Sequence, residues 1–311
     1  VLGWLFALFT AVAAFGIGNM VQSNSMADAM HVAFGVPEWV TGLAVALGVG
    51  AVILGGIRSI GRFTGVFVPM MVLLYLVASG VVLVLFADRI PAALALIFHD
   101  AFTGSAAAGG FLGATLAQAM RYGVARGIFS NESGLGSAGI AAAAAQTKEP
   151  VRQALVSMTQ TFIDTIVVCT FTGVAIVATG VWNSGENGAA LTQSAFAAAM
   201  PNGIGAAVVA VCLALFAFST ILGWAYYGGR SVEYLLGERA ILPYRLAFIA
   251  AAFAGSVYSL DFVWLVSDLM NGLMALPNLI GLLLLSGVAA RETRLYFERQ
   301  SAAGMTGRPG Q

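Results

Sequence analysis

The stretch RYGVARGIFSNESGLGS, residues 121–137, decides how the rest of this chain is interpreted. It places two arginines, a glutamate and four glycines in a 311-residue chain that is 59% hydrophobic and only 9% charged. Soluble domains carry about 25% charged residues, and the mean hydropathy here is +0.91. Composition therefore predicts an all-α polytopic membrane protein, in which a polar, glycine-rich stretch needs a particular reason.

Long apolar runs are expected to be helices, because a bilayer offers the backbone no hydrogen-bond partners. Two shorter amphipathic segments, 88–102 and 187–201, are expected to lie along the membrane interface. Turns rich in glycine, proline and charge separate the runs. The predicted spans are residues 1–22, 39–57, 64–86, 110–146, 154–182, 203–228, 245–259 and 262–288.

Lysine and arginine placement predicts the orientation of these spans. If the chain starts on the cytoplasmic side, only Arg89 among the loop residues falls outside. We expect a transmembrane domain over 1–290 and a cytoplasmic tail over 291–311, in the cell (inner) membrane with both ends of the chain cytoplasmic. The positions that fall inside are Arg58, Arg62, Lys148, Arg152, Arg230, Arg239, Arg245, Arg291, Arg294, Arg299 and Arg308.

The predicted span 110–146 is much longer than the roughly 20 residues that a membrane requires, and its middle is the opening stretch. Glycines there weaken a helix at a depth where only a helix is normally tolerated. In secondary transporters, interrupted helices turn half-helix ends and free backbone carbonyls toward substrate and ion. The alternative is an extramembrane loop between two ordinary features, and both interpretations stay open from the residues alone.

Four other polar residues lie in apolar runs. Asn19 and Gln22 share one face of the first span, where they could contact a zwitterion or cap the helix end. Ser219 and Thr220 lie in mid-span. Their hydroxyls could be ligands for a small cation such as sodium, or could bond back to the carbonyls of their own helix.

Ionisable residues inside spans are costly and therefore suggest function, although hydrogen-bonded packing explains them equally well. Asp164 and Asp268 are of this kind, the latter with the polar Asn271 close by in the sequence, and we assign these three residues no site. Cys169 and Cys212 lie in apolar runs and are expected to be small core residues rather than a disulfide. The net charge of zero, without a basic block, predicts no nucleic-acid partner.

Five motifs together resemble one family, in order along residues 1 to about 290. They are similar to the alanine or glycine:cation symporters, also called sodium:alanine symporters. The resemblance implies an inverted-repeat fold of the LeuT type, of which this chain would supply core helices three to ten. The first two core helices would be absent, so we expect a fragment with about half of a binding site. The motifs are AFGIGNMVQSNS (14–25), YGVARGIFSNESGLGSAGIA (122–141), TFIDTIVVCT (161–170), FAFSTILGWAYYG (216–228) and NGLMALPNLIGLLLLSG (271–287).

The resemblance also implies roles for particular residues. The sixth core helix would be broken near Gly127 to Gly134, and the indole of Trp224 would leave room only for a methyl-sized substrate side chain. The implied substrate contacts are Asn19, Gln22, Gly127, Ile128, Phe129, Ser130, Thr220, Gly223 and Trp224, and the implied sodium ligands are Ser219, Thr220 and the carbonyl of Phe216.

The function expected from this resemblance is secondary active symport, with inward sodium flux driving uptake of alanine or glycine by alternating access. No cofactor beyond sodium as coupling ion is expected, and the partners are the amino acid, sodium and membrane lipid, without an obligate protein partner. There are two alternatives. One is proton coupling through Asp164 or Asp268, and the other is a structural subunit that does not transport. A channel or a membrane enzyme is disfavoured, because the sequence shows no charged ring, G-x-S-x-G, H-E-x-x-H or P-loop motif.

Overall fold

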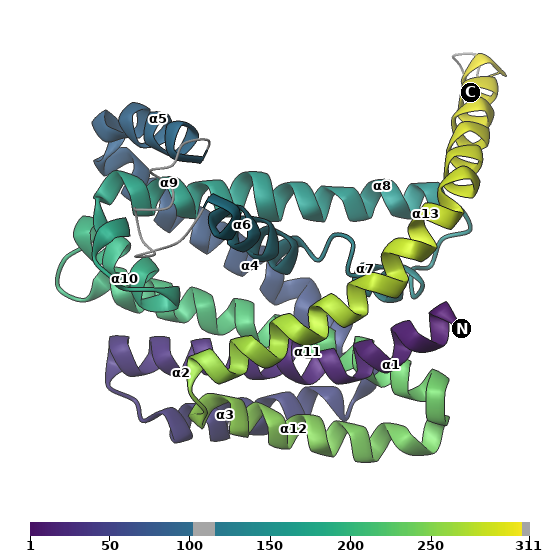
Figure 1. The fold of residues 1–311 in the computed structure, drawn as a ribbon, viewed down its shortest axis with the longest axis horizontal. Coiled ribbons are helices and arrows are strands. Elements are labelled where there is room, and N and C mark those ends of the chain that lie inside the picture. The colour runs from purple at the N-terminus through teal and green to yellow at the C-terminus, as the bar shows by residue number, and fades with distance from the viewer. Residues whose placement is uncertain (102–115, 307–311) are drawn as a thin grey trace, which may run out of the picture.

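The computed structural model describes residues 1–101 and 116–306, and it folds them as helices joined by short turns (Figure 1). Over these residues there is no strand. Two segments, η1 and η4, are π-helical, and η2, η5 and η6 are single turns of 3₁₀-helix. The elements are α1 (Leu2–Phe15), η1 (Gly16–Met20), α2 (Val21–Phe34), α3 (Glu38–Ile53), α4 (Gly56–Leu85), η2 (Ala87–Arg89), α5 (Ile90–Ala101), α6 (Leu116–Asn131), α7 (Ser137–Ala142), α8 (Pro150–Thr161), η4 (Phe162–Cys169), α9 (Thr170–Thr179), η5 (Val181–Asn183), α10 (Gly188–Ala199), α11 (Ile204–Leu236), η6 (Glu238–Ala240), α12 (Ile241–Val257) and α13 (Leu260–Thr306).

Helix ends follow the local chemistry of the chain. Pro150 opens α8 at a position where its missing N–H costs no hydrogen bond. Gly35 closes α2 with a φ of 68°, a left-handed conformation that glycine adopts without a steric penalty. Such sequence features locate the turns between the apolar runs.

Six helical stretches of the described residues are long and apolar enough to cross a membrane: 2–34, 56–85, 150–179, 204–236, 238–257 and 267–302. This agrees with the expected all-helical membrane protein, but eight spans were predicted. The predicted span 39–57 is the apolar helix α3, which has only 16 residues. The predicted span 110–146 lies partly outside the described residues, and its described part is divided between α6 and α7.

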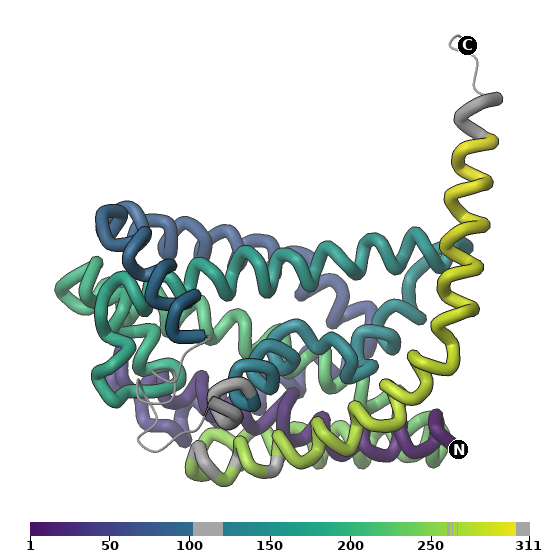
Figure 2. The backbone as a smooth tube through the Cα atoms, turned by 45° about the horizontal axis from the view of Figure 1, so that its top comes forward, coloured from purple at the N-terminus to yellow at the C-terminus, as the bar shows by residue number. Residues whose placement is uncertain are grey.

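The segments predicted to lie along the interface are short helices, α5 and α10. Helix α13 continues as a helix through position 290, where the sequence predicts the end of the transmembrane domain, and this boundary stays a prediction. Its 47 residues correspond to about 70 Å of helix, more than twice the hydrocarbon thickness of a bilayer. Figures 1 and 2 show its C-terminal part leaving the body of the protein.

Helix α11 joins two apolar clusters. One contains Trp224 of α11 with side chains of α1, α3, α12 and α13. The other contains Tyr75 and its neighbours in the C-terminal half of α4, Phe196 of α10, and side chains of α11. Helix α1 packs against α11 and α13, and α3 packs against α12. The centre of α11 is therefore enclosed, which positions its polar residues inside the bundle.

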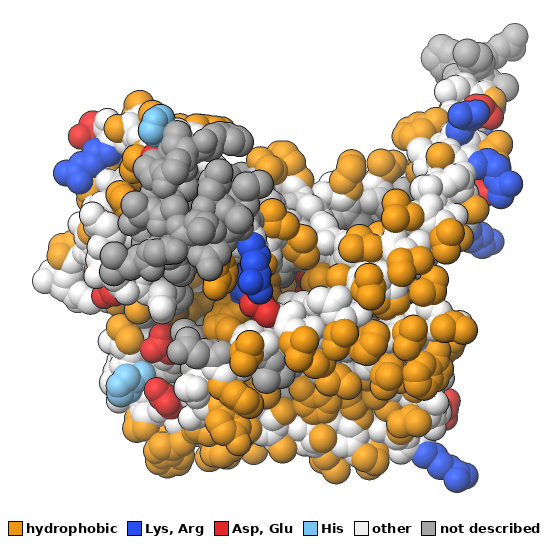
Figure 3. Space-filling view, viewed as in Figure 1, with side chains coloured by type: hydrophobic (Ala, Val, Ile, Leu, Met, Phe, Trp, Pro, Cys, Tyr) orange, Lys and Arg blue, Asp and Glu red, His pale blue; other side chains and the backbone are white. Residues whose placement is uncertain are grey.

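The outer surface is strongly apolar, as Figure 3 shows over α1, α12 and α13. Exposed side chains of this size would be unfavourable in water but are suited to lipid. They include Leu242, Leu246, Leu276, Leu283, Leu284 and Leu285.

Charged residues gather at the ends of the helices. At one end, Arg230 and Arg245 border a cavity of about 480 Å³, and at another Asp28, Glu38 and Glu186 border one of about 560 Å³. Each of these two cavities is bordered by loops that the predicted topology places on the same side of the membrane. Which end faces the cytoplasm stays a prediction.

Glycine permits close approach between α12 and the first membrane-crossing stretch. A methyl group at Gly255 would collide with the backbone of Met20 and the hydroxyl of Ser23. Small residues at such crossings are typical of helix packing in membranes.

We expect Gly255→Ala to lower the thermal midpoint in detergent, since overpacking of this kind costs about 1–3 kcal/mol. Gly61→Ala is the matched control, because a methyl group there meets nothing within 4 Å and alanine favours the helix by up to about 1 kcal/mol. Thermal unfolding followed by loss of helix signal measures both variants. Equal midpoints would show that the contact at Gly255 is not tight.

Candidate functional site

The interruption predicted in the fourth span is present, but it begins after Asn131 rather than near Gly127. Helix α6 continues through Gly127, Ile128, Phe129 and Ser130 and ends at Asn131, and α7 starts at Ser137. The five residues between them, 132–136, form the break. The positions implied as unwound substrate contacts thus lie in the last turns of a regular helix.

The break turns sharply because three of its residues have positive φ: Glu132 at 56°, Gly134 at 82° and Gly136 at 94°. The side chain of Asn131 accepts a hydrogen bond from the backbone N–H of Ser133 at 2.9 Å. Asn278 of α13 donates to the carbonyl of Gly134, also at 2.9 Å. Side-chain amides thus take the place of helical hydrogen bonds on both sides of the turn.

Glu132 joins the break to α11. Its Oε1 accepts a hydrogen bond from the indole Nε1 of Trp224 at 2.8 Å, and its Oε2 accepts one from the hydroxyl of Ser137 at 2.5 Å. Trp224 and Ser137 are buried. On the other side of the indole lies Gly18 of η1, where any Cβ would overlap the ring.

A cavity of about 420 Å³ lies against this group. Trp224 and Gly223 of α11 form one wall, and a methyl group at Gly223 would meet nothing within 4 Å, so this position faces open space. The volume lies in the range of small-molecule sites. Its polar lining residues, besides Trp224, are Thr64, Glu132, Gln153, Ser157, Gln160, Ser219, Thr220 and Tyr227.

Ser219 and Thr220 lie on the cavity wall, and both hydroxyls donate to the carbonyl oxygen of Phe216, at 2.9 and 3.0 Å. This is the helix-internal bonding that the sequence left open as an alternative to ion binding. It also brings the three oxygens proposed as sodium ligands to one place. Their role as ligands stays a prediction.

Asn19 and Gln22 lie elsewhere. Asn19 is fully buried and donates to the carbonyl of Phe248 at 2.6 Å, so it ties η1 to α12. Gln22 donates to the carbonyl of Ile17 at 3.1 Å. Neither lines the cavity between Glu132 and Trp224 in the part of the chain that the structure describes.

The end of α6 makes polar contacts with η4. Ser130 donates to the carboxylate of Asp164 at 2.8 Å, and Asn131 donates to Thr165 at 3.0 Å. Asp164 therefore forms the hydrogen-bonded packing contact considered in the sequence analysis.

Arg126 of α6 pairs with Asp268 of α13. One guanidinium nitrogen lies 2.5 and 2.6 Å from the two carboxylate oxygens. The same guanidinium lies 4.2 Å above the ring of Trp264. This side-chain cluster connects the helix that precedes the break with α13.

Comparison with known proteins decides the family. The profile described as the sodium:alanine symporter family matches residues 1–308. The chain belongs to the sodium:alanine symporter family. The resemblance seen in the motifs is confirmed, and this family consists of transporters rather than enzymes.

Individual relatives carry related names. The chain is 52% identical over 302 residues to the sodium/alanine symporter AgcS of Methanococcus maripaludis, covering 96% of this chain and 65% of the relative. It is 52% identical over 297 residues to an uncharacterized transporter of Haemophilus influenzae, covering 95% and 65%. A probable sodium/glutamine symporter of Bacillus subtilis, GlnT, is 36% identical over 306 residues, covering 97% and 63%. The chain thus spans just under two thirds of the length of these curated relatives.

Sequence reasoning did not select Glu132, although it lies in the opening stretch. The rule applied to Asp164 and Asp268, that an ionisable residue inside a membrane span suggests function, applies to Glu132 as well. The spacing of Gln153, Ser157 and Gln160 could have indicated a polar face of α8.

We expect Asp268→Ala to lower the thermal midpoint in detergent, because Arg126 loses the partner that joins α6 to α13. Exposed ion pairs contribute about 0.2–1 kcal/mol, and the side chains here are 36% and 46% exposed. The shift should therefore be small and should shrink in 1 M salt.

Glu233→Ala is the control, because it removes an ion pair of similar exposure that lies within the single helix α11. We expect a smaller shift from this variant. Equal shifts would contradict a role for Arg126 and Asp268 in holding the two helices together.

Proposed function

We propose that this chain belongs to a sodium-coupled symporter that takes up a small neutral amino acid, alanine or glycine, by alternating access. The observation that carries the proposal is the cavity beside the interrupted helix, closed on one side by Trp224 and on another by Glu132. Membership in the sodium:alanine symporter family and the name of the relative AgcS support the choice of substrate and ion.

The chemistry of the cavity fits a small zwitterion. Gln153 and Gln160 offer amide donors and acceptors for its ammonium and carboxylate groups. The buried indole of Trp224 excludes large side chains, which favours glycine or alanine over leucine. We further propose an inverted-repeat fold of the LeuT type over residues 1–290, which the interrupted helix at 132–136 supports.

Asn19 and Gln22 remain proposed substrate contacts, together with Gly127, Ile128, Phe129 and Ser130. In the conformation described, Asn19 and Gln22 bond to backbone carbonyls. They would have to exchange these bonds for substrate when the bundle changes conformation.

Sodium would bind to Ser219, Thr220 and the carbonyl of Phe216. Oxygen atoms are the ligands that hard cations prefer, and the hydroxyl oxygens of Ser219 and Thr220 lie 2.9 and 3.0 Å from the carbonyl oxygen of Phe216. Each hydroxyl could turn its proton away and present a lone pair to the ion. We further propose that both ends of residues 1–311 face the cytoplasm, which agrees with the arginine and lysine distribution.

Proton coupling is the second candidate, and one observation favours it: the cavity contains a carboxylate, Glu132. Asp164 and Asp268, the earlier candidates, are bonded to Ser130 and Arg126. A relative, YrbD of Bacillus subtilis, is named as a putative sodium/proton-dependent alanine carrier protein, which supports this second candidate.

Transport by the complete open reading frame in liposomes tests the function. We expect labelled alanine to accumulate under an inward sodium gradient and not when potassium replaces sodium, because only the sodium gradient supplies the driving force. Uptake that ignores sodium and follows an imposed pH gradient would favour proton coupling. Absence of uptake under both gradients, from folded protein, would contradict the proposed symport.

We expect Thr220→Val to raise the sodium concentration for half-maximal uptake roughly tenfold, since loss of one ligand oxygen costs on the order of 1.4 kcal/mol. Thr179→Val is the matched control, because its hydroxyl makes the same bond to a carbonyl four residues earlier but lies in α9, and Thr179 is not among the residues lining the cavity in the described part of the chain. Unchanged sodium dependence in the first variant would remove Thr220 from the ion site.

A further inference from the structure

Glu132 has a backbone conformation that is unusual for its residue type. Its φ is 56°, and it directly follows the last residue of α6. Glycine or asparagine normally occupies this position after a helix, because a larger side chain is strained there. Among the described residues, one other non-glycine residue has a positive φ, and it is an asparagine, Asn202. A glutamate at this strained position therefore suggests that its side chain has a function.

The carboxylate connects two elements across the break. Oε1 accepts from Trp224 of α11 and Oε2 accepts from Ser137 of α7. Both carboxyl oxygens of Glu132 are therefore engaged, one on each of these elements. The turn at 132–136 is thereby held against α11.

The indole of Trp224 is restrained on its other side as well. Gly18 leaves space for the ring where any side chain would overlap it, and Tyr227 packs edge-on with ring centroids 5.5 Å apart. Only the hydrogen bond to Glu132 directs the indole N–H among the described contacts. The position of this cavity wall therefore depends on a residue of the break.

We propose that Glu132 is a positioning residue that fixes the indole of Trp224 and so sets the largest substrate side chain that the cavity accepts. The inference rests on the proposed function, since it concerns the selectivity of an amino-acid carrier. Through the hydrogen bond between Glu132 and Trp224, the interrupted helix would limit the size of the substrate side chain.

Glu132→Gly and Glu132→Gln separate this role from its alternatives. Glycine removes the carboxylate and relieves the strain of the positive φ, so a loss of selectivity cannot be ascribed to backbone strain at this position. Glutamine keeps an oxygen that can accept from Trp224 and an amide that can donate to Ser137, but it removes the charge. Asn202→Gly is the matched control, because it relieves the same kind of strain at a residue that does not border this cavity.

The measurement is the ratio of half-maximal concentrations for leucine and alanine as competitors of labelled alanine uptake under a sodium gradient. We expect Glu132→Gly to lower this ratio about tenfold, in the range that one or two methylene groups contribute to selectivity. Trp224→Ala should lower it at least as much, and the double variant should add little. Glu132→Gln and Asn202→Gly should keep the parental ratio.

Two results would overturn the positioning role. If Glu132→Gly is as selective as the parent, the hydrogen bond does not set substrate size. If Glu132→Gln loses selectivity as strongly as Glu132→Gly, the negative charge matters rather than the position of the indole, as expected for a direct contact with ammonium or a proton.

A readout without transport keeps the test independent of the proposed function. The thermal midpoints of Glu132→Gly, Trp224→Phe and the double variant form a cycle in detergent, in which phenylalanine keeps the ring and lacks the N–H. We expect the double variant to differ from the sum of the single shifts. Additive shifts would show that Glu132 and Trp224 are not coupled, whether or not the parent protein carries alanine.

Discussion

The backbone of residues 132–136 must satisfy its hydrogen bonds without a helix, and much of the surrounding structure depends on this constraint. In hydrocarbon an unpaired amide costs several kcal/mol, so irregular backbone survives only where protein groups or a cavity replace water. Asn131 and Asn278 supply side-chain partners, and the carboxylate of Glu132 fastens the turn to its neighbours. The polar residues of the opening stretch are explained by these contacts.

Two other irregular segments meet this region. The π-helical segment η1 places Gly18 against the indole of Trp224, and η4 places Asp164 and Thr165 against the end of α6. Extra residues in a helical turn shift side chains out of register and are frequent at functional sites. The two π-helical segments thus contact the indole that walls the cavity and the helix end that precedes the break.

Composition and periodicity were sufficient to predict an all-helical membrane protein, because hydrocarbon leaves the backbone few choices, and the glycines of 121–137 predicted a break between helices. The exact position of the interruption could not be read from glycine content: Gly127 sits within a regular helix, whereas Glu132 adopts the left-handed turn. Ser219, Thr220, Gly223 and Trp224 line one cavity, since one helical segment carries them all, and their roles stay a prediction. The hydrogen bonds of Asn19 and Gln22 depend on how α12 and η1 are placed, which no local pattern specifies.

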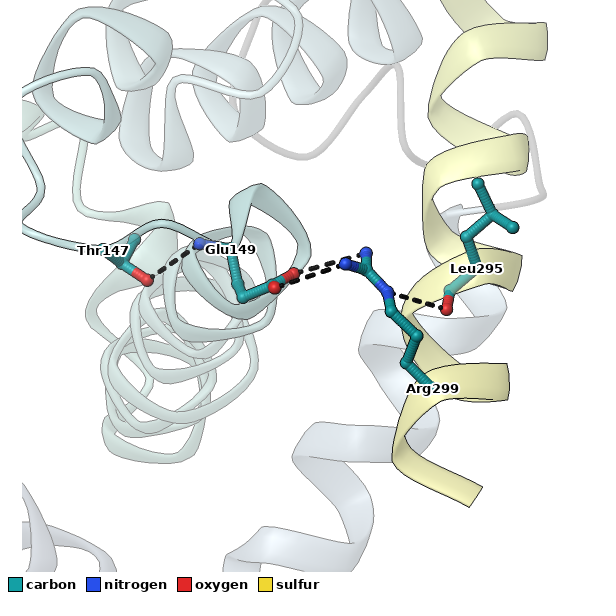
Figure 4. A network of polar contacts seen from close by, with 4 residues as sticks. All are labelled: Thr147, Glu149, Leu295 and Arg299. Carbon is teal, nitrogen blue, oxygen red and sulfur yellow. Dashed lines mark hydrogen bonds and ion pairs between the residues drawn. The ribbon is translucent and has the colours of Figure 1, made fainter. Parts of the chain in front are cut away.

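Helix α13 is one continuous element with contacts at two distant places. Asn278 touches the interrupted helix, and Arg299 lies 3.5 Å from the carboxylate of Glu149, just before α8, as Figure 4 shows. These residues are 21 positions apart, which corresponds to about 32 Å of helix. Helix α13 thus contacts both the turn at 132–136 and the residue that precedes α8. A movement of α13 at one of these contacts would therefore displace the other.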